Sequence, residues 1–593
     1  MRFRTALLLT VAGSMSLVAP GVARAYAPGD LDYTFGIGGK AISPFVTTLS
    51  DAHGMTLQSD GKTVVVGGTS AGGGGSSDAI VLRYTSDGIL DSTFSGDGML
   101  STDFGASESY AGVAVQPDGK VVTVGTNSTI TNIILARYTS AGVLDNTFDG
   151  DGRATITLAG KTVVTASEVA VLSDGKLLLA GYVDSDIAIL RVNSNGSLDT
   201  SFDADGYAVA NLGMTARGFS MTLQADGKIV VAGDAYTNGN WNQAQAAVVR
   251  FNSNGSLDTT FDGDGMQTFT FGGTSQTLYS STVQSDGRIV VAGGATSGGA
   301  DDIAVARFNS NGSLDTTFGG DGKITVDVAG GSDGSSGVTM HPDGKKIYVA
   351  GYAGTGGYSD AVVARINGDG SLDTSFSSDG IAIQDVRSQS DFAQSMVVQS
   401  DGKVVLAGYT DYSTRTDVFV MRFQSQNSVV APAASAPASV TYAPRNTSVV
   451  IEWTATAGTP EYVVTANDGT VVCITTSTIC TINGLQNGVA ATYLVYGRNA
   501  DGVQSASSGS VAVRAGFQVK TTTVKAKKSL KLSSIATTPS LGRQTWRSLS
   551  GGCRVVGGTL VAPTKKGTCQ VKLSVAKKGS YPAMSTTIAV SVS

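Results

Sequence analysis

The stretch SNGSLDTTFGGDGKITV, residues 310–326, carries the tag Leu-Asp-x-x-Phe, which recurs along two thirds of the chain. The tag begins at Leu31, Leu90, Leu144, Leu198, Leu257, Leu314 and Leu372. A second tag, an Asp-Gly pair followed by Lys or Arg, begins at Asp60, Asp118, Asp174, Asp226, Asp286, Asp343 and Asp401. The equal number and constant order of the two tags indicate a repeat protein.

The spacing of the tags predicts the type of repeat. Successive Leu-Asp-x-x-Phe tags are 59, 54, 54, 59, 57 and 58 residues apart, which is near the length of a four-stranded propeller blade. One unit contains four apolar segments that predict short strands, at residues 322–328, 337–341, 346–351 and 361–366. Asp-Gly and Asn-Gly pairs between them predict tight turns. We therefore predict an all-β chain in which residues 30–425 form a seven-bladed β-propeller.

A recurring Arg–Asp pair predicts how the ring closes. In six units the Arg of the last apolar segment is followed eight residues later by the Asp of the tag. These pairs are Arg83 and Asp91, Arg137 and Asp145, Arg191 and Asp199, Arg250 and Asp258, Arg307 and Asp315, and Arg365 and Asp373. Arg422 has no such Asp, whereas Asp32 at the start of the chain has no such Arg. We expect residues 31–35 to complete the last blade against residues 417–423.

The repetition of this pair argues for a structural role, because a binding site normally departs from the symmetry of a ring. We thus interpret Arg83, Asp91, Arg422, Asp32 and their equivalents as structural residues. Two roles remain open: the Arg side chain binds carbonyl groups or an Asp between blades, or the Asp caps the turn of its own tag.

The repeated segments LDTTF, QPDGK or QSDGK, KIVVAG and AVARFNSNGSLD resemble the delta-60 repeat, a family of predicted β-propellers in secreted bacterial proteins. The resemblance covers residues 30–425 and implies the propeller fold and secretion. It implies no catalytic residues.

Two smaller β-sandwich domains are predicted beyond a Pro/Ala/Ser-rich linker, residues 426–437. Residues 438–515 resemble a fibronectin type III domain in the positions of Trp453, Leu485 and Tyr493. Residues 517–593 resemble a small bacterial immunoglobulin-like module. The cysteines predict two local disulfides, Cys473–Cys480, closing a hairpin, and Cys553–Cys569.

Residues 1–25 are typical of a secretory signal peptide, with Arg2 and Arg4 before a short apolar run and Ala23-Arg24-Ala25 as cleavage site. No later run is long enough to cross a membrane as a helix. We expect the mature chain to be secreted, extracellular or associated with the cell wall. Residues 517–593 contain 13 Lys and Arg and no acid, which favours an anionic cell-wall polymer over nucleic acid as their partner.

Neither histidine predicts catalysis. His341 occupies a turn position and His53 has no recognisable partner, so no catalytic residue is assigned. The pairs Asp149 and Asp151, Asp203 and Asp205, and Asp262 and Asp264 leave calcium open, but the set of ligands is incomplete. Solvated acidic turns are the alternative, and we expect neither a metal nor another cofactor.

The loops between the third and fourth predicted strands differ most between units, and variable loops carry function more often than repeated ones. They contain aromatic residues suited to stacking on sugar rings or on a protein surface: Tyr182, Tyr236, Trp241, Tyr352, Tyr358, Tyr409 and Tyr412. We expect a secreted or cell-surface, non-enzymatic binding or scaffold protein for an extracellular glycan or protein. The alternative is a secreted polysaccharide-degrading hydrolase or lyase that uses propeller carboxylates.

Overall fold

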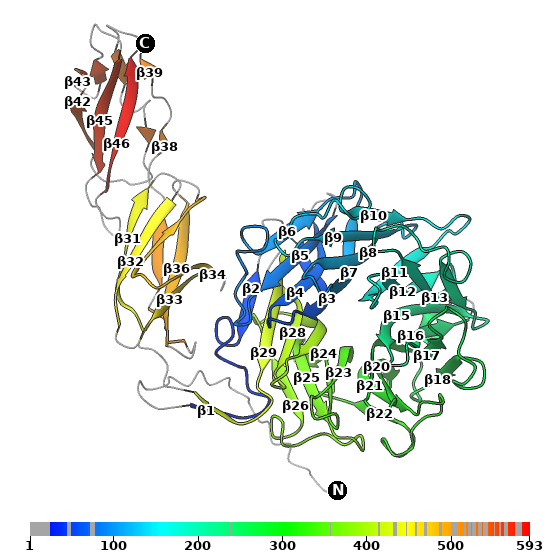
Figure 1. Cartoon of the computed structure of the whole chain (residues 1–593). Helices are drawn as coiled ribbons and strands as arrows, with labels where there is room; N and C mark the ends of the chain where they lie inside the picture. Colours follow the sequence, from blue (N-terminus) through cyan, green and yellow to red (C-terminus); the bar gives the residue numbers. More distant parts are fainter. Residues whose placement is uncertain are drawn as a thin grey trace. The chain divides into compact units, whose positions relative to one another are not determined.

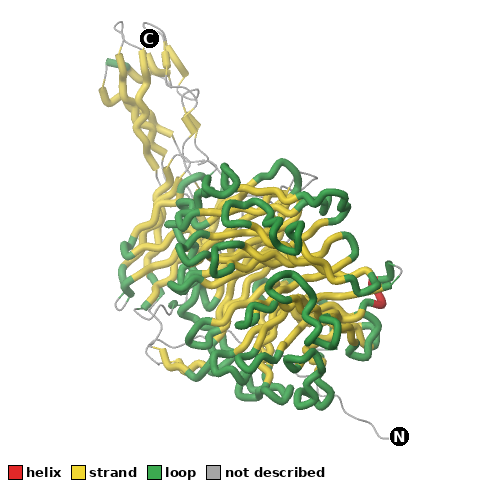
Figure 2. The backbone as a smooth tube through the Cα atoms, turned by 45° about the vertical axis from the view of Figure 1, so that its right-hand side comes forward, coloured by secondary structure: helices red, strands yellow, loops and turns green. Residues whose placement is uncertain are grey.

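The structure, a computed structural model, divides into two compact units, Ala25–Ser428 and a second unit that contains Val429–Ser593. It describes residues 24–592 except 44–48, 71–76, 238, 329, 356, 413–414, 431–435, 446–447, 457–458, 468–470, 486–488, 500–503, 506, 509, 515–517, 520–522, 525–528, 532–535, 538–543, 551, 557–558, 562–566 and 576–583. Residues 1–23 of the expected signal peptide thus lie outside the described part. Strands dominate both units, and the described residues contain one short 3-10 helix, η1 (Trp241–Gln243) (Figure 2).

The first unit is a seven-bladed propeller, in which each blade is a four-stranded antiparallel sheet (Figure 1). Blades 1 and 2 comprise β3 (Leu49–Leu57), β4 (Thr63–Ser70), β5 (Ser77–Tyr84), β6 (Met99–Thr102), β7 (Glu108–Val115), β8 (Val121–Asn127), β9 (Ile133–Tyr138) and β10 (Arg153–Ile156). Blades 3 and 4 comprise β11 (Val164–Val171), β12 (Leu177–Val183), β13 (Asp186–Val192), β14 (Tyr207–Ala210), β15 (Thr215–Leu223), β16 (Ile229–Tyr236), β17 (Gln245–Phe251) and β18 (Met266–Phe269). Blades 5 and 6 comprise β19 (Gln276–Val283), β20 (Ile289–Ser297), β21 (Ala300–Phe308), β22 (Lys323–Val326), β23 (Asp333–Met340), β24 (Ile347–Thr355), β25 (Tyr358–Ile366) and β26 (Ile381–Gln384). Blade 7 comprises β27 (Asp391–Val398), β28 (Val404–Tyr412), β29 (Arg415–Phe423) and β2 (Lys40–Ser43).

The first strands of successive blades contact one another around the ring, from β3 through β27 and back to β3. The neighbouring blades cover both faces of the second and third strands of each blade, so the apolar side chains of both faces are buried. In blade 4, for example, Val231 packs with Leu178 and Ile189 of blade 3, whereas Val230 packs with Ile289 and Val291 of blade 5. Burial on both faces explains why segments such as KIVVAG are almost continuously apolar.

The predicted grouping of strands is wrong by one position. The short strand at 322–328 was expected to begin the unit that follows it, but β22 pairs with β21 and completes the preceding blade. The reason is the tag itself: Asp315 N donates to Arg307 O and Arg307 N donates to Gly322 O, so the chain returns alongside β21. Each tag therefore joins the third strand of a blade to its outer, fourth strand.

The N-terminal segment closes the ring. Arg422 Nε donates to Asp32 Oδ2 at 2.8 Å, as the unmatched Arg and Asp of the sequence predicted. Leu31 forms a single bridge with Phe423, but the strand that completes blade 7 is β2, which pairs antiparallel with β29 from Lys40 to Ser43. The outer strand thus lies downstream of the predicted residues 31–35.

The recurring Arg and Asp together perform both structural roles that the sequence left open. In blade 1, Arg83 Nε donates to Asp91 Oδ2 at 2.8 Å, and Arg83 Nη1 donates to Ser140 O of blade 2 at 2.6 Å. Asp91 Oδ1 in turn accepts Thr93 N and the Thr93 hydroxyl, and so caps the turn of its tag. Nζ of Lys62, in the Asp-Gly-Lys tag, lies 3.7 Å from Oδ2 of the same Asp91. The two tags therefore form one network that holds neighbouring blades together.

This network predicts an acid-sensitive propeller. Burial alone would raise the pKa of each tag Asp, but hydrogen bonds from Thr or Ser and nearby Arg or Lys charges outweigh it. The pKa is therefore lowered at Asp32, Asp91, Asp145, Asp199, Asp258, Asp315 and Asp373. The stabilisation is present above the unfolded pKa of about 3.9 and is lost as the pH falls through the lower folded values.

We expect the melting temperature to fall steeply below about pH 4, since each carboxylate contributes on the order of 1 kcal/mol. Glu168 acts in the opposite sense, because burial raises its pKa to about 7 and its protonation favours the folded state between about pH 4.5 and 7. Thermal unfolding followed by circular dichroism from pH 2.5 to 7.5 measures both slopes. A melting temperature at pH 3 equal to that at pH 6 would contradict the prediction.

The second unit contains β-strands in several sheets. Its first part has the sheets β31-β32-β35 and β34-β33-β36-β37, formed by β31 (Ala438–Arg445), β32 (Ser448–Thr454), β33 (Glu461–Ala466), β34 (Val471–Thr475), β35 (Ile479–Ile482), β36 (Ala490–Arg498) and β37 (Val511–Arg514). Trp453 and Tyr493 are buried in a core that both sheets share. The second part contains β38 (Gln518–Val519), β39 (Thr523–Val524), β40 (Ser529–Lys531), β41 (Ala536–Thr537), β42 (Gln544–Ser550), β43 (Arg554–Val556), β44 (Thr559–Val561), β45 (Gly567–Val575) and β46 (Met584–Val592). Two short strands, β1 (Arg24–Tyr26) and β30 (Ser428–Val430), flank the propeller in the sequence.

Both predicted disulfides are present, Cys473–Cys480 and Cys553–Cys569. The first was expected to close a hairpin, but it does not. Cys473 lies in β34 and Cys480 in β35, and these strands belong to different sheets, so the bond ties the two sheets together. Among the described residues no helix has the length and hydropathy needed to span a bilayer. These properties are compatible with an extracellular protein.

Candidate functional site

The antiparallel blades place their connections on two faces. The tag face carries the turns between first and second strands and those between third and fourth strands, and thus both repeated tags. The loop face carries the connections between second and third strands and between successive blades. Because the tag face is occupied by the repeated Arg–Asp network, the variable residues of the loop face are the better candidates for a functional site.

The predicted aromatic residues differ in exposure. Trp241 of η1 is 62% exposed and Tyr358 of β25 is 52% exposed, so both present most of their side chain to solvent. Tyr236, Tyr352 and Tyr409 are half-buried. Tyr182 is half-buried in β12, and the side chain of Tyr412 lies outside the described part of the structure.

Three half-buried aromatic residues of blades 6 and 7 lie close together. The ring centroids of Phe392 and Tyr409 are 5.2 Å apart, and those of Tyr352 and Phe392 are 5.3 Å apart. In blades 4 and 5, the rings of Phe219 and Tyr279 are 5.5 Å apart. Tyr279 contributes to the raised pKa of Tyr352, so the two groups are neighbours. We call Phe219, Tyr236, Tyr279, Tyr352, Phe392 and Tyr409 the aromatic arc.

Two residues of the arc lie at irregular positions in the first strands of their blades. Phe219 and Tyr279 are the extra residues of β-bulges in the first strands β15 and β19. The bulge presses the backbone of the first strand against the second, and a Cβ on Gly233 would lie 1.8 Å from Arg217 O. Only Gly fits at that place in the second strand, which accounts for the Ala-Gly ending of the KIVVAG segment.

The arc breaks the symmetry of the repeats. The bulge residues of blades 1, 2 and 3 are His53, Ala111 and Ser167, none of them as large as Phe219 or Tyr279. The cross-strand partners Phe392 and Tyr409 of blade 7 correspond to Ser109 and Thr126 in blade 2. Large aromatic bulge residues therefore occur in blades 4 and 5 and an aromatic cross-strand pair occurs in blade 7, whereas the same positions of blade 2 carry small or hydroxyl-bearing residues.

A rigidly held guanidinium accompanies the arc. Arg217 donates from Nε to Asp234 Oδ1 at 3.0 Å and from Nη2 to Asp234 Oδ2 at 2.5 Å. Asp234 is completely buried and also accepts the Thr277 hydroxyl at 3.0 Å. The Arg217 guanidinium lies 5.2 Å from the ring centroids of both Phe219 and Tyr236, and the side chain keeps 30% exposure. A cation fixed in this way can bind a carboxylate, sulfate or hydroxyl group of a ligand.

Tyr279, Tyr352 and Tyr409 of the arc have a raised pKa and remain neutral at physiological pH. The pKa of Tyr352 is raised to about 12, chiefly by burial and further by the Asp301 carboxylate. The pKa of Tyr409 is raised by burial, with Asp411 and Asp51 adding to the shift. Protonated phenols donate hydrogen bonds as well as stacking, so the arc can recognise a ligand that has both apolar faces and hydroxyl groups.

Each histidine contacts an Asp two residues away in the sequence. His53 Nε2 lies 3.0 Å from Asp51 Oδ2, and both side chains are more than 40% exposed. His341 Nδ1 accepts Asp343 N at 3.1 Å and so holds its own turn, as a turn residue does.

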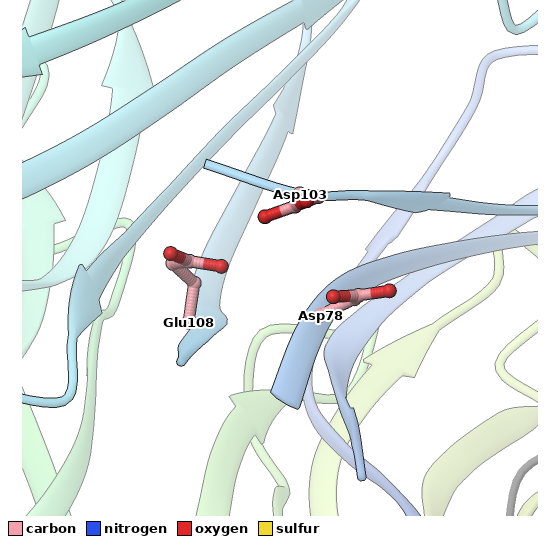
Figure 3. A group of neighbouring side chains, drawn as sticks. All are labelled: Asp78, Asp103 and Glu108. Atoms are coloured by element: carbon pink, nitrogen blue, oxygen red, sulfur yellow. The ribbon is translucent and has the colours of Figure 1, made fainter. Parts of the chain in front are cut away.

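The acidic pairs that left calcium open are turn residues on the tag face. Asp151 Oδ1 accepts Arg153 N at 2.9 Å, and Asp264 Oδ1 accepts Met266 N at 2.9 Å. Asp149 and Asp262 adopt positive φ angles of 50° within these turns. Among the described residues, the structure instead brings other carboxylates together at three junctions between blades on the loop face. These groups are Asp78, Asp103 and Glu108, drawn in Figure 3, and Asp302, Asp327 and Asp333, and Asp360, Asp385 and Asp391.

Arg217, Phe219, Tyr279 and Phe392 were missed by the sequence analysis. A signal for two of them was present, because Phe219 and Tyr279 each precede by five residues the Gln of the Asp-Gly-Lys tag, Gln224 and Gln284. His53 stands at the same distance before Gln58. Comparison of this column between units would have shown large aromatic residues in some blades and small ones in others.

The comparisons with known proteins agree with the fold. A family described as "Domain of unknown function (DUF5122) beta-propeller" matches residues 58–94, 116–148, 172–202, 224–261, 284–318, 341–376 and 399–428. These segments contain the Asp-Gly-Lys or Asp-Gly-Arg tags of all seven blades and the Leu-Asp-x-x-Phe tags of blades 1 to 6. Among curated proteins, none shows significant similarity to this sequence.

Solved structures resemble the chain only distantly. An ulvan lyase of polysaccharide lyase family PL25 is 10% identical over 69% of this chain and 98% of its own, with a TM-score of 0.38. Sqt1 from Chaetomium thermophilum is 12% identical over 65% of this chain and 97% of its own, with a TM-score of 0.35. This chain spans 22% of a family 28 exopolygalacturonase from Yersinia enterocolitica at 16% identity, with 15% of its own length and a TM-score of 0.14. No functional conclusion follows from these scores. The family model matches one segment in each of the seven blades and supports a propeller family.

Proposed function

We propose that the protein is a secreted or cell-surface, non-enzymatic binding protein that holds an extracellular glycan on the loop face of its propeller. The observation that carries this proposal is the aromatic arc beside Arg217. Aromatic faces stack on the apolar faces of sugar rings, and a guanidinium held by Asp234 offers charged hydrogen bonds to acidic or hydroxyl groups. An acidic polysaccharide combines both features.

We also propose that Val429–Ser593 acts as a spacer built from a fibronectin type III-like and an immunoglobulin-like module. Seven strands in two sheets, with Trp453 and Tyr493 in the shared core, support the first assignment. The disulfide Cys553–Cys569 supports a small, separately stabilised second module.

A glycan-binding measurement tests the propeller's role. The mature chain, residues 26–593, is screened on an array of neutral and acidic polysaccharides, and the dissociation constant of the best ligand is measured by isothermal titration calorimetry. Tyr279→Ala should weaken binding roughly tenfold, because it removes one stacking surface of about 1.5 kcal/mol. Arg217→Ala should weaken binding of an acidic ligand by roughly 10- to 100-fold, the value of a charged hydrogen bond.

Val143→Ala and Lys345→Ala are matched controls, since both residues are exposed and lie in turns of the tag face. Both should bind like the wild type. Unchanged affinity in Tyr279→Ala and Arg217→Ala would contradict the proposed site. Release of shortened or unsaturated oligosaccharides by the wild type would instead support the alternative, a polysaccharide-degrading hydrolase or lyase.

A further inference from the structure

The charges beside the aromatic arc differ between its two ends. At the end on blades 4 and 5, the Arg217 guanidinium lies 5.2 Å from the ring centroids of Phe219 and Tyr236. Burial raises the pKa of Tyr182 and Tyr279, and the charge of Arg217 opposes this shift in both. A positive charge therefore acts on tyrosines of blades 3 and 5 as well as on the rings of blade 4.

Carboxylates accompany the other end of the arc, on blades 6 and 7. Burial raises the pKa of Tyr352 to about 12, and Asp301 contributes next to this shift. Burial likewise raises the pKa of Tyr409, with further contributions from Asp411 and Asp51. All three acids are half-buried, so their charges are partly open to solvent and to a ligand. An acidic group of a ligand would be repelled at this end.

The strand geometry directs Asp301 toward blade 6. Asp301 and Ile303 are two residues apart in β21 and therefore lie on the same face of its sheet. Ile303 packs with Val338 and Val349 of blade 6. The Thr296 hydroxyl donates to Asp301 Oδ1 at 2.5 Å. A hydroxyl donor holds the carboxylate in place and leaves its negative charge uncompensated.

Arg217 offers the outer edge of its guanidinium to a ligand. Its bonds to Asp234 use Nε and Nη2, so among the described residues the N–H groups of Nη1 have no acceptor. Asp234 is completely buried and is also fixed by the Thr277 hydroxyl. One acidic group of a ligand can therefore be bound at Arg217 through charged hydrogen bonds.

The aromatic rings of the arc belong to separate blades. Phe219 and Tyr279, on blades 4 and 5, have ring centroids 5.5 Å apart, and Phe392 and Tyr409, both on blade 7, have centroids 5.2 Å apart. Tyr352 of blade 6 lies next to Phe392. A sugar ring stacks on the face of one aromatic ring, so a ligand that contacts both ends must be a chain of several sugars.

We infer that the arc binds a linear polysaccharide in which acidic residues are separated by uncharged ones. One acidic group lies at Arg217, and uncharged, hydroxyl-bearing sugars lie beside Tyr352 and Tyr409. The inference rests on the proposed function and narrows its ligand. A polymer with an acid on every residue would bring like charges against Asp301 and Asp411, whereas a neutral polymer would leave Arg217 without an acidic partner.

Galacturonan with different degrees of methyl esterification tests the inference, because esterification removes charge and leaves the backbone unchanged. The mature chain, residues 26–593, is titrated with unesterified, randomly half-esterified and fully esterified galacturonan of equal length. Dissociation constants are measured by isothermal titration calorimetry. The half-esterified polymer should bind roughly tenfold more tightly than either of the other two.

Two variants locate the effect on the arc. Asp301→Asn should tighten binding of the unesterified polymer by roughly threefold or more, because it removes the repulsion, and should leave binding of the fully esterified polymer unchanged. Arg217→Gln should abolish the preference for the half-esterified over the fully esterified polymer. Since Arg217→Gln leaves Asp234 buried without its partner, Asp301→Asn provides the test that does not disturb this pair. Asp264→Asn, in a turn of the tag face, is the matched control and should keep the wild-type order of affinities.

The outcomes separate this inference from the proposed function. If the unesterified polymer bound most tightly, or if Asp301→Asn left its affinity unchanged, the inference would be overturned while a glycan site at the arc would stand. Absence of binding to all three galacturonans would also overturn the inference, whereas the proposed function fails only when no polysaccharide of the array binds. A half-esterified disaccharide that bound as tightly as the polymer would contradict contact along the arc.

Discussion

Deletion of residues 26–43 is expected to prevent the propeller from folding as one cooperative unit. The deletion removes β2, the outer strand of blade 7, and exposes the edge of β29 from Val418 to Met421. It also removes Asp32, which is completely buried, and so leaves Arg422, only 6% exposed, without its acid. Breaking such a buried pair costs about 3–5 kcal/mol.

Apolar burial adds to this loss. Phe35 is 1% exposed and packs with Val405, Val418 and Val420, and its burial contributes about 1.5–3 kcal/mol. The sum approaches the total stability of a typical domain, about 5–15 kcal/mol. We therefore expect the truncated chain to aggregate or to unfold without a cooperative transition in thermal circular dichroism.

A point variant within the same segment is the matched control. Asp30→Ala removes an exposed side chain whose Oδ2 accepts Ala27 N, and it should change the unfolding free energy by about 0.5 kcal/mol or less. A truncated chain that melts at the wild-type temperature would show that the ring does not depend on its N-terminal strand.

The second large effect is expected from Arg250→Ala. Arg250 is 2% exposed, and its Nε donates to Asp258 Oδ2 and its Nη1 to Ser310 O, each at 2.6 Å. The guanidinium also lies 4.8 Å from the centroid of Phe261. The substitution leaves Asp258 buried, removes a bond between blades 4 and 5 and creates a cavity, so we expect a loss of about 3–5 kcal/mol in urea unfolding.

Two comparisons separate this effect from a general sensitivity to lost charge. Arg153→Ala removes an exposed Arg–Asp pair and should cost about 1 kcal/mol or less. The double variant Arg250→Ala/Asp258→Ala should be less destabilised than the sum of its single variants, because no unpaired buried charge remains. Additive losses, or an Arg250→Ala chain as stable as the wild type, would refute the role of the pair in joining blades.

The candidate site was only partly predictable. The sequence placed Tyr236, Tyr352, Tyr358, Tyr409 and Trp241 in variable loops between strands. The structure has Trp241 in η1, outside the strands, but places Tyr236, Tyr352, Tyr358 and Tyr409 within β16, β24, β25 and β28. The sequence did not predict Arg217 or Phe392 as site residues, since neither lies in a variable loop. Both lie in the first strands of their blades, where the closed ring, and not proximity in the sequence, brings residues of different blades together.

The carboxylates that cluster between blades could not be predicted for a related reason. Asp78 and Glu108 are 30 residues apart and belong to different repeats, so no local spacing predicts that their carboxylates lie close together. The acidic turns such as Asp262 and Asp264 have a local spacing that suggests calcium, yet their carboxylates hold their own backbone. The local pattern therefore marked turn residues and not the carboxylates that cluster between blades.

The sequence by itself determined the all-β class, the number of blades, the unmatched Arg422 and Asp32 that close the ring, and both disulfide pairs. These follow from repetition and from counting, which need no knowledge of contacts. Only the tertiary structure decided which blade contains each short outer strand, that Cys473–Cys480 joins two sheets, and which side chains of different blades contact one another. Those features depend on pairings between distant segments, and the free energy of such pairings is set by burial and charge in the folded ring rather than by neighbours in the chain.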